Sequence, residues 1–257
     1  MSKIRRSNNY FELLWVLAKT DFKLRYQGSV LGYLWSLLKP FLMFVVLYVV
    51  FSVFMRWEIA HYQLYLLLGI IIWNFFAEGT MAGLNTFLTK SEVMKKIYFP
   101  RILIVLASTI SAFISLLLNV LVFLLIYLFS GMDLHAWMLF FPVYLILIYL
   151  FVVGISLFLS VLQVKYRDVE QIWEVLLQAG FFITPIIYPL MMVPEKYWFY
   201  LFLNPVTGII QYSRKLIIEQ SLPSLSGTLY VFLFIVFVVV FGYWVFNKLS
   251  YKVIEEL

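Results

Sequence analysis

Residues 102–129 read ILIVLASTISAFISLLLNVLVFLLIYLF, a continuous apolar run without a charged side chain. About 20 predominantly apolar residues are enough for a helix to cross the hydrocarbon core of a bilayer. Inside lipid every backbone polar group needs an internal partner, which only helices and closed barrels provide, and barrel strands are shorter and alternate in polarity. The stretch therefore predicts a membrane-spanning helix and an all-α integral membrane protein.

Similar apolar runs recur along the rest of the chain. The six predicted spans are Tyr33–Met55, Tyr62–Leu88, Ile102–Phe129, Ala136–Val164, Ile172–Met191 and Leu225–Phe246. Hydrophobic residues make up 64% of the chain and charged residues 12%, whereas soluble domains average about 45–50% and about 25%. We therefore predict a single transmembrane domain over residues 1–257, with a six-span bundle at 33–246.

The basic residues are concentrated in alternate gaps between the predicted spans, and this pattern sets the orientation. Of the 19 Lys and Arg residues, the other gaps hold only Arg56, Lys196, Arg214 and Lys215. Because positively charged loops stay on the cytoplasmic side, we predict that both termini are cytoplasmic. The formal net charge of +6 then reflects membrane orientation, and no nucleic-acid partner is expected.

The segment 10–26, which precedes the first span, is predicted to form an amphipathic helix. Its apolar face consists of Phe11, Leu14, Trp15, Ala18 and Phe22. Its other stripe is mostly polar and consists of Glu12, Val16, Lys19 and Lys23. Such a helix would lie in the membrane interface. The alternative is a cytoplasmic helix that packs against the bundle.

The gap between the second and third spans is predicted to hold a short basic helix at 90–99. Thr89 and Glu92 have the spacing of a capping box, so a helix can start there. Pro100 disfavours its continuation. A short, basic, cytoplasmic helix suits docking of another protein, and an ordinary basic loop is the alternative.

Residues 193–213, after the fifth predicted span, are predicted to form an external re-entrant or interfacial hairpin. Prolines interrupt the chain before an apolar and aromatic stretch at Tyr197–Leu203. Asn204 and Pro205 then separate that stretch from a second short apolar one. Neither half is long enough to cross a membrane. An aromatic belt at the interface is the alternative.

Glu78 lies within the second predicted span. An acidic side chain that faced lipid would be costly, and such residues usually face the bundle interior or a polar pathway. Glu78 is therefore a candidate site residue. The alternative is a position near a helix interface with no role in transport.

The residue content excludes several chemistries. The chain has no cysteine, which excludes disulfides, thiolate metal sites and thiol catalysis. It contains neither the GxxxxGK[ST] phosphate loop nor the GxSxG nucleophile motif, and its two histidines, His61 and His135, lie far apart. We therefore expect no catalytic site, no metal site and no cofactor on this chain.

Short stretches along the whole chain share features with one family. They are DFKLRYQGSVLGYLW at 21–35 with LKP at 38–40, KKIYFPR at 95–101, YRDV at 166–169 with TPIIY at 184–188, and LNP at 203–205. In this order they resemble the permease subunits of ABC-2 type polysaccharide exporters. That family exports O-antigen, capsular polysaccharide and teichoic acid.

The resemblance implies ATP-driven export of a lipid-linked polysaccharide across the bacterial cytoplasmic membrane. The partners would be a second copy of the chain and two copies of a nucleotide-binding subunit, which would hold ATP and Mg. The helix at 90–99 would couple to that subunit through Glu92, Lys95, Lys96, Tyr98 and Arg101. The anionic head group of the substrate would meet Lys19, Lys23 and Arg25. The candidate intramembrane or gate residues are Glu78, Tyr188, Tyr197, Trp198, Asn204 and Pro205.

Three other functions stay open at this point. One is an ABC-type exporter for a drug or lipid cargo, another is a membrane-embedded transferase acting on lipid carriers, and a third is a passive channel. An enzyme would need clustered Asp, Glu or His at the membrane edge. The densest acidic group apart from the C-terminal tail is Asp168, Glu170 and Glu174, and ion pairing with Arg167 explains it more simply.

Overall fold

The computed structural model describes residues 10–96 and 99–251, and within those ranges every regular element is a helix. The elements, in chain order, are α1 (Tyr10–Tyr26), η1 (Gly32–Leu34), α2 (Trp35–Tyr48), η2 (Val49–Phe54), α3 (Tyr62–Leu84), α4 (Thr86–Thr89), α5 (Ser91–Lys96), α6 (Ile102–Phe129), η3 (Ala136–Phe140), α7 (Phe141–Lys165), α8 (Val169–Ile183), η4 (Leu190–Met192), η5 (Glu195–Tyr197), α9 (Trp198–Phe202), α10 (Pro205–Ile217) and α11 (Leu225–Leu249). The prediction of an all-α protein is confirmed.

Five helical segments in the described ranges are long and apolar enough to cross a membrane. They are Gly32–Phe54, Tyr62–Leu84, Ile102–Phe129, Ala136–Lys165 and Leu225–Leu249. Each coincides with a predicted span. The second is shorter than predicted, because α3 ends at Leu84 and a turn at Asn85 separates it from α4.

The fifth predicted span, Ile172–Met191, differs most from the structure. Its helix, α8, runs from Val169 to Ile183 and is about 22 Å long, whereas the hydrocarbon core is about 30 Å thick. The helix ends because Thr184, which precedes Pro185, has extended backbone with ψ of 132°. A residue before proline is driven out of the helical region by the proline ring. The predicted helical extent beyond Ile183 is therefore wrong, and a sixth membrane-spanning helix is not confirmed.

The chain from α8 to Ile187 nevertheless follows α3 from one end to the other. Near the C-terminal end of α3, the Asn85 side chain donates to the Glu170 carboxylate over 2.7 Å. At the N-terminal end of α3, the Tyr62 hydroxyl donates to the Ile187 carbonyl over 3.0 Å. The segment 169–187 thus covers the length of α3 as a short helix followed by irregular backbone.

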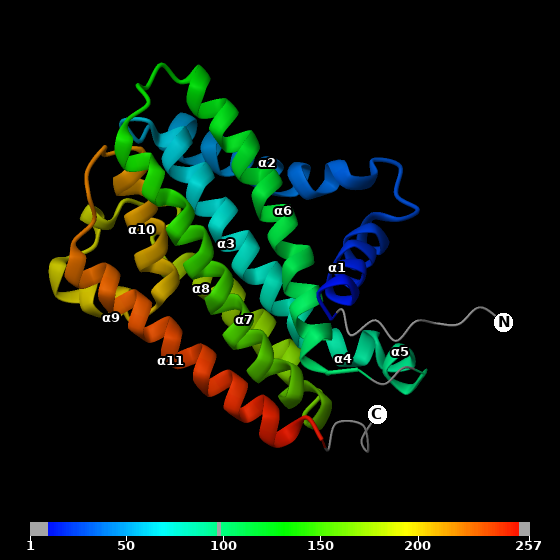
Figure 1. Ribbon diagram of the computed structural model, residues 1–257. Coiled ribbons are helices and arrows are strands. Elements are labelled where there is room, and N and C mark those ends of the chain that lie inside the picture. The colour runs from blue at the N-terminus through cyan, green and yellow to red at the C-terminus, as the bar shows by residue number, and fades with distance from the viewer. Residues whose placement is uncertain (1–9, 97–98, 252–257) are drawn as a thin grey trace.

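Helix α3 is the buried centre of the bundle, and it packs against α6, α7, α2, α8 and α10. Figure 1 shows α4, α5 and the end of α11 at one end of the bundle, with the turn between α6 and α7 at the other. Successive long helices α3, α6 and α7 therefore alternate in direction along the chain, whereas α7 runs parallel to its neighbours α3 and α11.

The tightest helix crossing joins α7 and α11. A Cβ atom built on Gly242 of α11 would lie 2.2 Å from the Gly154 carbonyl oxygen of α7. A Cβ atom on Gly154 would lie 2.9 Å from the Val239 backbone nitrogen. Only glycine allows this approach, and small residues at such crossings are typical of membrane helices.

The outward faces of α2, α8 and α11 are apolar and exposed. On α8, for example, Ile172, Val175, Phe182 and Ile183 all project from the bundle. An apolar surface of this extent is not stable in water. It is the surface expected of helices that contact lipid or another apolar protein surface.

Candidate functional site

A large cavity opens between α1, α2, α3, α6 and α8. Its volume is about 1260 Å³. Charged side chains from α1, α2 and α3 line it, together with one residue between α4 and α5; they are Asp21, Arg25, Lys39, Glu78 and Lys90. Polar and aromatic side chains complete the wall, including Asn74, Asn119, Ser115, Trp35 and Trp73. The cavity is thus the place where polar groups from segments far apart in the sequence meet.

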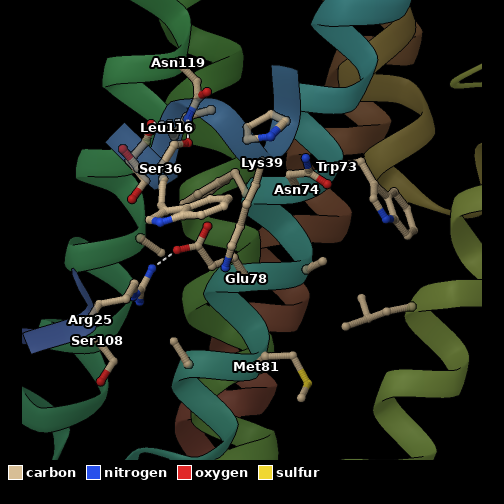
Figure 2. Close-up of a pocket in the computed structure, with 18 of the residues that line it drawn as sticks. Arg25, Ser36, Lys39, Trp73, Asn74, Glu78, Met81, Ser108, Leu116 and Asn119 are labelled. Atoms are coloured by element: carbon tan, nitrogen blue, oxygen red, sulfur yellow. Dashed lines mark hydrogen bonds and ion pairs between the residues drawn. The ribbon is translucent and has the colours of Figure 1, made fainter. Parts of the chain in front are cut away.

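Glu78 projects from α3 into this cavity and forms an ion pair with Arg25 of α1 (Figure 2). The Glu78 side chain is 39% exposed and the Arg25 side chain 25% exposed. Figure 2 shows Lys39, from α2, extending alongside Glu78. Two cations therefore stand on the same side of the cavity as a single carboxylate, so an additional anion could be accommodated there.

A second ion pair joins Asp21 of α1 to Lys90, the residue between α4 and α5. The Lys90 ammonium also donates to the Ser108 hydroxyl of α6 over 3.0 Å. Burial lowers the pKa of Lys90, and the neighbouring Asp21 opposes this shift. The Asp21 carboxylate is thus what keeps a charge favourable at this partly buried position.

The upper part of the cavity is held by a hydrogen-bonded amide. Asn119 of α6 donates to the Ser36 carbonyl over 3.0 Å and to the Ser115 carbonyl over 2.7 Å. These bonds join α6 to the start of α2, and Figure 2 shows Asn119 and Ser36 side by side. The Asn119 amide therefore fixes the distance between two walls of the cavity.

The predicted head-group residues are not all brought together. Arg25 lines the cavity, whereas Lys19 and Lys23 lie on the exposed side of α1 and do not line it. Helix α1 has the predicted bounds and packs on α6, with Ala18 fully buried. Phe11 and Trp15 remain exposed. Helix α1 therefore packs against the bundle, as one interpretation expects, and also presents exposed apolar side chains, as expected of a helix in the membrane interface.

The predicted coupling residues lie at the end of the bundle that holds α5. A helix is present at Ser91–Lys96, within the predicted range 90–99, and it carries Glu92, Lys95 and Lys96. Tyr98 lies outside the described residues. Arg101 donates to the Ser250 carbonyl and stacks over the Tyr251 ring at 5.1 Å, so its guanidinium joins α6 to the end of α11.

The capping box predicted for this helix is not formed as expected. The Thr89 hydroxyl donates to the Asn85 carbonyl over 3.0 Å, one turn back, and so belongs to the end of α4. Thr89 lies in α4 itself, and its hydroxyl finds an acceptor within its own helix. Sequence spacing alone could not reveal that a separate helical turn precedes α5.

Apart from Glu78 on α3, the predicted intramembrane or gate residues occupy the segment between α8 and α11. The Asn204 side chain accepts from the Val206 backbone over 3.1 Å and donates to the Thr184 hydroxyl over 3.2 Å, so it caps α10. Pro205 is the first residue of that helix, where proline is favoured. Tyr188 donates to the Ile183 carbonyl over 2.6 Å, and Trp198 to the Val193 carbonyl over 2.9 Å. Tyr197 is exposed beside Lys196.

Arg214 of α10 is the largest fully buried side chain among the described residues. Its guanidinium donates to the carbonyls of Pro185 and Ile186, at 2.6 and 2.7 Å, and to the Tyr65 carbonyl at 2.9 Å. It also lies over the Tyr65 ring, 3.3 Å from the ring centroid. Burial lowers the pKa of Arg214 to about 10, which leaves it charged at neutral pH.

Sequence reasoning missed Arg214, Asp21 and Lys90 as structural participants. Arg214 carried a signal, because it is a cation inside the apolar stretch that follows Pro205. The distribution of basic residues predicts only that it is an external charge. Asp21 and Lys90 carry no comparable signal, since they pair with each other and lie 69 residues apart along the chain.

The fold and the cavity define a polytopic helical membrane protein with a charged cavity between its helices. The chain belongs to the ABC-2 type transporter family, whose family model matches residues 12–218. It is 33% identical over 252 residues to an O-antigen export system permease protein, RfbA, of Klebsiella pneumoniae, which covers 96% of this chain and 95% of that protein.

Two further relatives are similar over different lengths. An RfbA protein of Myxococcus xanthus is 28% identical over 226 residues, which is 86% of this chain and 85% of that protein. The polysialic acid transport protein KpsM of Escherichia coli is 32% identical over 62 residues, or 24% of each chain. The predicted family is therefore confirmed. Because that family consists of transporters, it also argues against the transferase alternative.

Proposed function

We propose that this chain is the permease subunit of an ATP-driven exporter that moves a lipid-linked polysaccharide across the bacterial cytoplasmic membrane. The observation that carries this proposal is the similarity to O-antigen export permeases over nearly the full length of both chains. The shorter match to a polysialic acid transport protein points to the same class of cargo. We therefore propose a glycan cargo, and we take its carrier to be an anionic lipid.

The proposed topology has six crossings, with both termini in the cytoplasm. The alternation of basic gaps supports this orientation. The hydrogen bonds of Glu170 and Ile187 to opposite ends of α3 support a crossing by the segment 169–187. The segment 193–213 would then form the outer re-entrant hairpin, and the packing of α10 against α3, α7 and α11 supports its place beside the bundle.

The cavity suits an amphiphilic substrate of this kind. Arg25 and Lys39 offer two cations to a phosphate-bearing head group, and Arg binds such groups through paired hydrogen bonds. Trp35 and Trp73 offer apolar faces, and Asn74 and Asn119 offer amides, which suits sugar rings. Lys19 and Lys23 lie outside the cavity, where they would meet the anionic lipid surface.

ATP and Mg would be bound by a separate nucleotide-binding subunit, in two copies, docked on the α5 helices of a homodimer. Helix α5 supports this arrangement because it is short, basic and at the end of the bundle. Closure of the ATPase subunits would shift the two copies of this chain and open the path between them.

The test is a gentle detergent purification of the tagged chain from its native host. A stoichiometric ATP-binding subunit is expected to co-purify with the wild-type chain. The double substitution Lys95→Glu and Lys96→Glu is expected to abolish that association or its ATP turnover. The matched control is Lys196→Glu with Lys215→Glu, two cations of the proposed outer side. A chain that purifies alone in several mild detergents would contradict the proposed function.

A further inference from the structure

The residues that join α3 to α5 form more contacts with other elements than a connecting loop requires. We define the α4 junction as residues 85–90. Asn85 donates to Glu170 of α8 over 2.7 Å, and Thr86 shares a 2.7 Å hydrogen bond with Ser108 of α6. Lys90 forms its ion pair with Asp21 of α1. The junction is therefore attached to three separate elements, α1, α6 and α8, and all three form walls of the cavity.

The junction is also continuous with α5. The Lys90 backbone nitrogen donates to the Thr86 carbonyl over 3.2 Å, which closes the last turn of α4. The Lys90 carbonyl accepts from the Met94 backbone over 3.2 Å, which closes the first turn of α5. Lys90 thus belongs to both helical turns through its backbone, while its side chain holds α1. Because hydrogen bonds join both turns through Lys90, we expect a displacement of α5 to move α4 as well.

The Lys90–Asp21 pair is sheltered enough to transmit a displacement. The two side chains are only 15% and 17% exposed. Separating them would leave two charges in a poorly solvated place, and such a pair resists separation far more than an exposed one. The Ser108 hydroxyl, which bonds to both Thr86 and Lys90, holds the same site against α6.

We propose that Lys90 and Asp21 are positioning residues that make the α1 wall of the cavity follow the movement of α5. Docking and closure of the ATPase subunit at α5 would shift the α4 junction, and the ion pair would carry that shift to α1. The cavity would then widen or close at the side where Asp21, Leu24 and Arg25 line it. This inference rests on the proposed function, because it takes α5 as the docking helix.

The experiment measures the α1 wall directly in the purified complex of the chain with its ATPase subunit. Leu24 lies on the cavity side of α1 and is exposed. The chain has no cysteine, so Leu24→Cys supplies a single thiol. Its rate of reaction with a maleimide is compared with and without a non-hydrolysable ATP analogue and Mg.

In the parent Leu24→Cys complex we expect nucleotide to change the labelling rate by about fivefold or more, the lower end of typical coupling between sites. Lys90→Met and Asp21→Asn should each abolish that change while the ATPase subunit remains bound. The exchanged pair, Asp21→Lys with Lys90→Asp, should restore it. Lys248→Met, a cation at the end of α11 outside the cavity, is the matched control and should keep it.

A merely structural role of the pair predicts a different pattern. The nucleotide-dependent change would then persist in the variants that assemble, or the exchanged pair would fail to restore it, and either result would overturn the inference. If the Lys90→Met complex does not assemble, Asp21→Asn and the exchanged pair provide the test. Asp21→Asn removes the charge but keeps a hydrogen-bond acceptor for Lys90, so assembly is expected. A parent complex without a nucleotide-dependent change would also overturn it. A wild-type chain that recruits no ATPase would instead contradict the proposed function, and the inference with it.

Discussion

Three cations inside this bundle each have a defined set of partners. Arg25 pairs with Glu78, Lys90 pairs with Asp21, and Arg214 is surrounded by backbone carbonyls. Charges in an apolar environment persist only when paired or hydrogen-bonded. The first two pairs line the cavity, whereas Arg214 holds the irregular backbone after α8. These residues therefore differ in role although all are cations.

Replacing Arg214 with methionine is expected to destabilise the protein. Methionine fills much of the space but leaves the carbonyls of Tyr65, Pro185 and Ile186 without their buried donor. The free energy of unfolding should fall by about 2–4 kcal/mol. The measurement is the thermal unfolding midpoint in detergent.

Two companion variants sharpen this test. Lys215→Met removes the neighbouring cation, which is only half-buried, and should leave the midpoint nearly unchanged. Gly69→Ala would place a Cβ atom 2.6 Å from the Arg214 Nη2 atom, so it should destabilise the wild type. It should have less effect in an Arg214→Met background, because the clash is then relieved. Equal effects in both backgrounds would contradict the proposed contact.

Arg25 and the lysines of α1 are expected to differ in their effect on export. Arg25→Gln should lower export of the lipid-linked substrate by about tenfold, because hydrogen bonds to charged groups contribute about 1.5–3 kcal/mol. Lys19→Gln together with Lys23→Gln should have a smaller effect, since neither side chain lines the cavity. The measurement is substrate export by reconstituted complexes at equal assembly. Glu78→Gln controls for loss of the ion pair, and an equal loss in that variant would assign the effect to the pair.

At the scale of elements, the bundle is held together by close crossings around α3 and between α7 and α11. The core cluster surrounds α3 on several sides, which explains why α3 is more buried than the other long helices. The crossing of α7 and α11 depends on Gly154 and Gly242, whose backbones touch. In lipid, helices associate through packing rather than through the hydrophobic effect, so this approach contributes directly to stability.

Gly242→Leu is therefore expected to separate α7 from α11. Its Cβ atom would lie 2.2 Å from the Gly154 carbonyl oxygen, and overpacking of this kind typically costs about 1–3 kcal/mol. The measurement is the unfolding midpoint together with the yield of folded protein. Val240→Leu, two residues earlier on the exposed side of α11, should behave as the wild type. A normal midpoint for Gly242→Leu would show that the helices can move apart freely.

At the scale of the whole molecule, the two ends of the bundle have different characters. One end holds α4, α5 and the end of α11, together with the chain between α7 and α8 (Figure 1). The other end holds the turn between α6 and α7, which contacts α10 through the His135 side chain and the Leu216 carbonyl. The basic gaps of the sequence fall at the first end, which is the end we propose to be cytoplasmic.

Single-cysteine labelling tests this orientation without a background, because the chain has no cysteine. Leu134→Cys, in the turn between α6 and α7, should react with a membrane-impermeant maleimide in intact spheroplasts. Tyr166→Cys, between α7 and α8, should react only after permeabilisation. Both side chains are exposed, so access within the protein does not limit either reaction. The reverse pattern would place the termini outside.

Residue composition and periodicity predicted most elements of the fold. Long apolar runs predicted the five long helices, because lipid permits few other structures. The bounds of α1 and α6 agree with those predicted. The end of α8 and the separate turn of α4 were not predicted, because each depends on local backbone geometry beside Pro185 or Asn85 rather than on average hydrophobicity.

The candidate site was predicted only in part. Glu78 was identified because an acid within an apolar span is unusual, and Arg25 because it belongs to a basic helix. Their pairing was not predictable, since they lie on different helices and are brought together only by the packing of α1 on α6. The same holds for Asp21 and Lys90.

The sequence by itself determined that this protein is a helical membrane bundle, which segments are apolar enough to cross, and which family it belongs to. These properties follow from local composition and from motifs whose residues are close together in the chain. The tertiary structure alone decided which charges share a cavity, that Arg214 closes the break after α8, and that Lys90 joins α5 to α1. Those contacts link residues distant in sequence, and only the packing of the helices sets the distances between them.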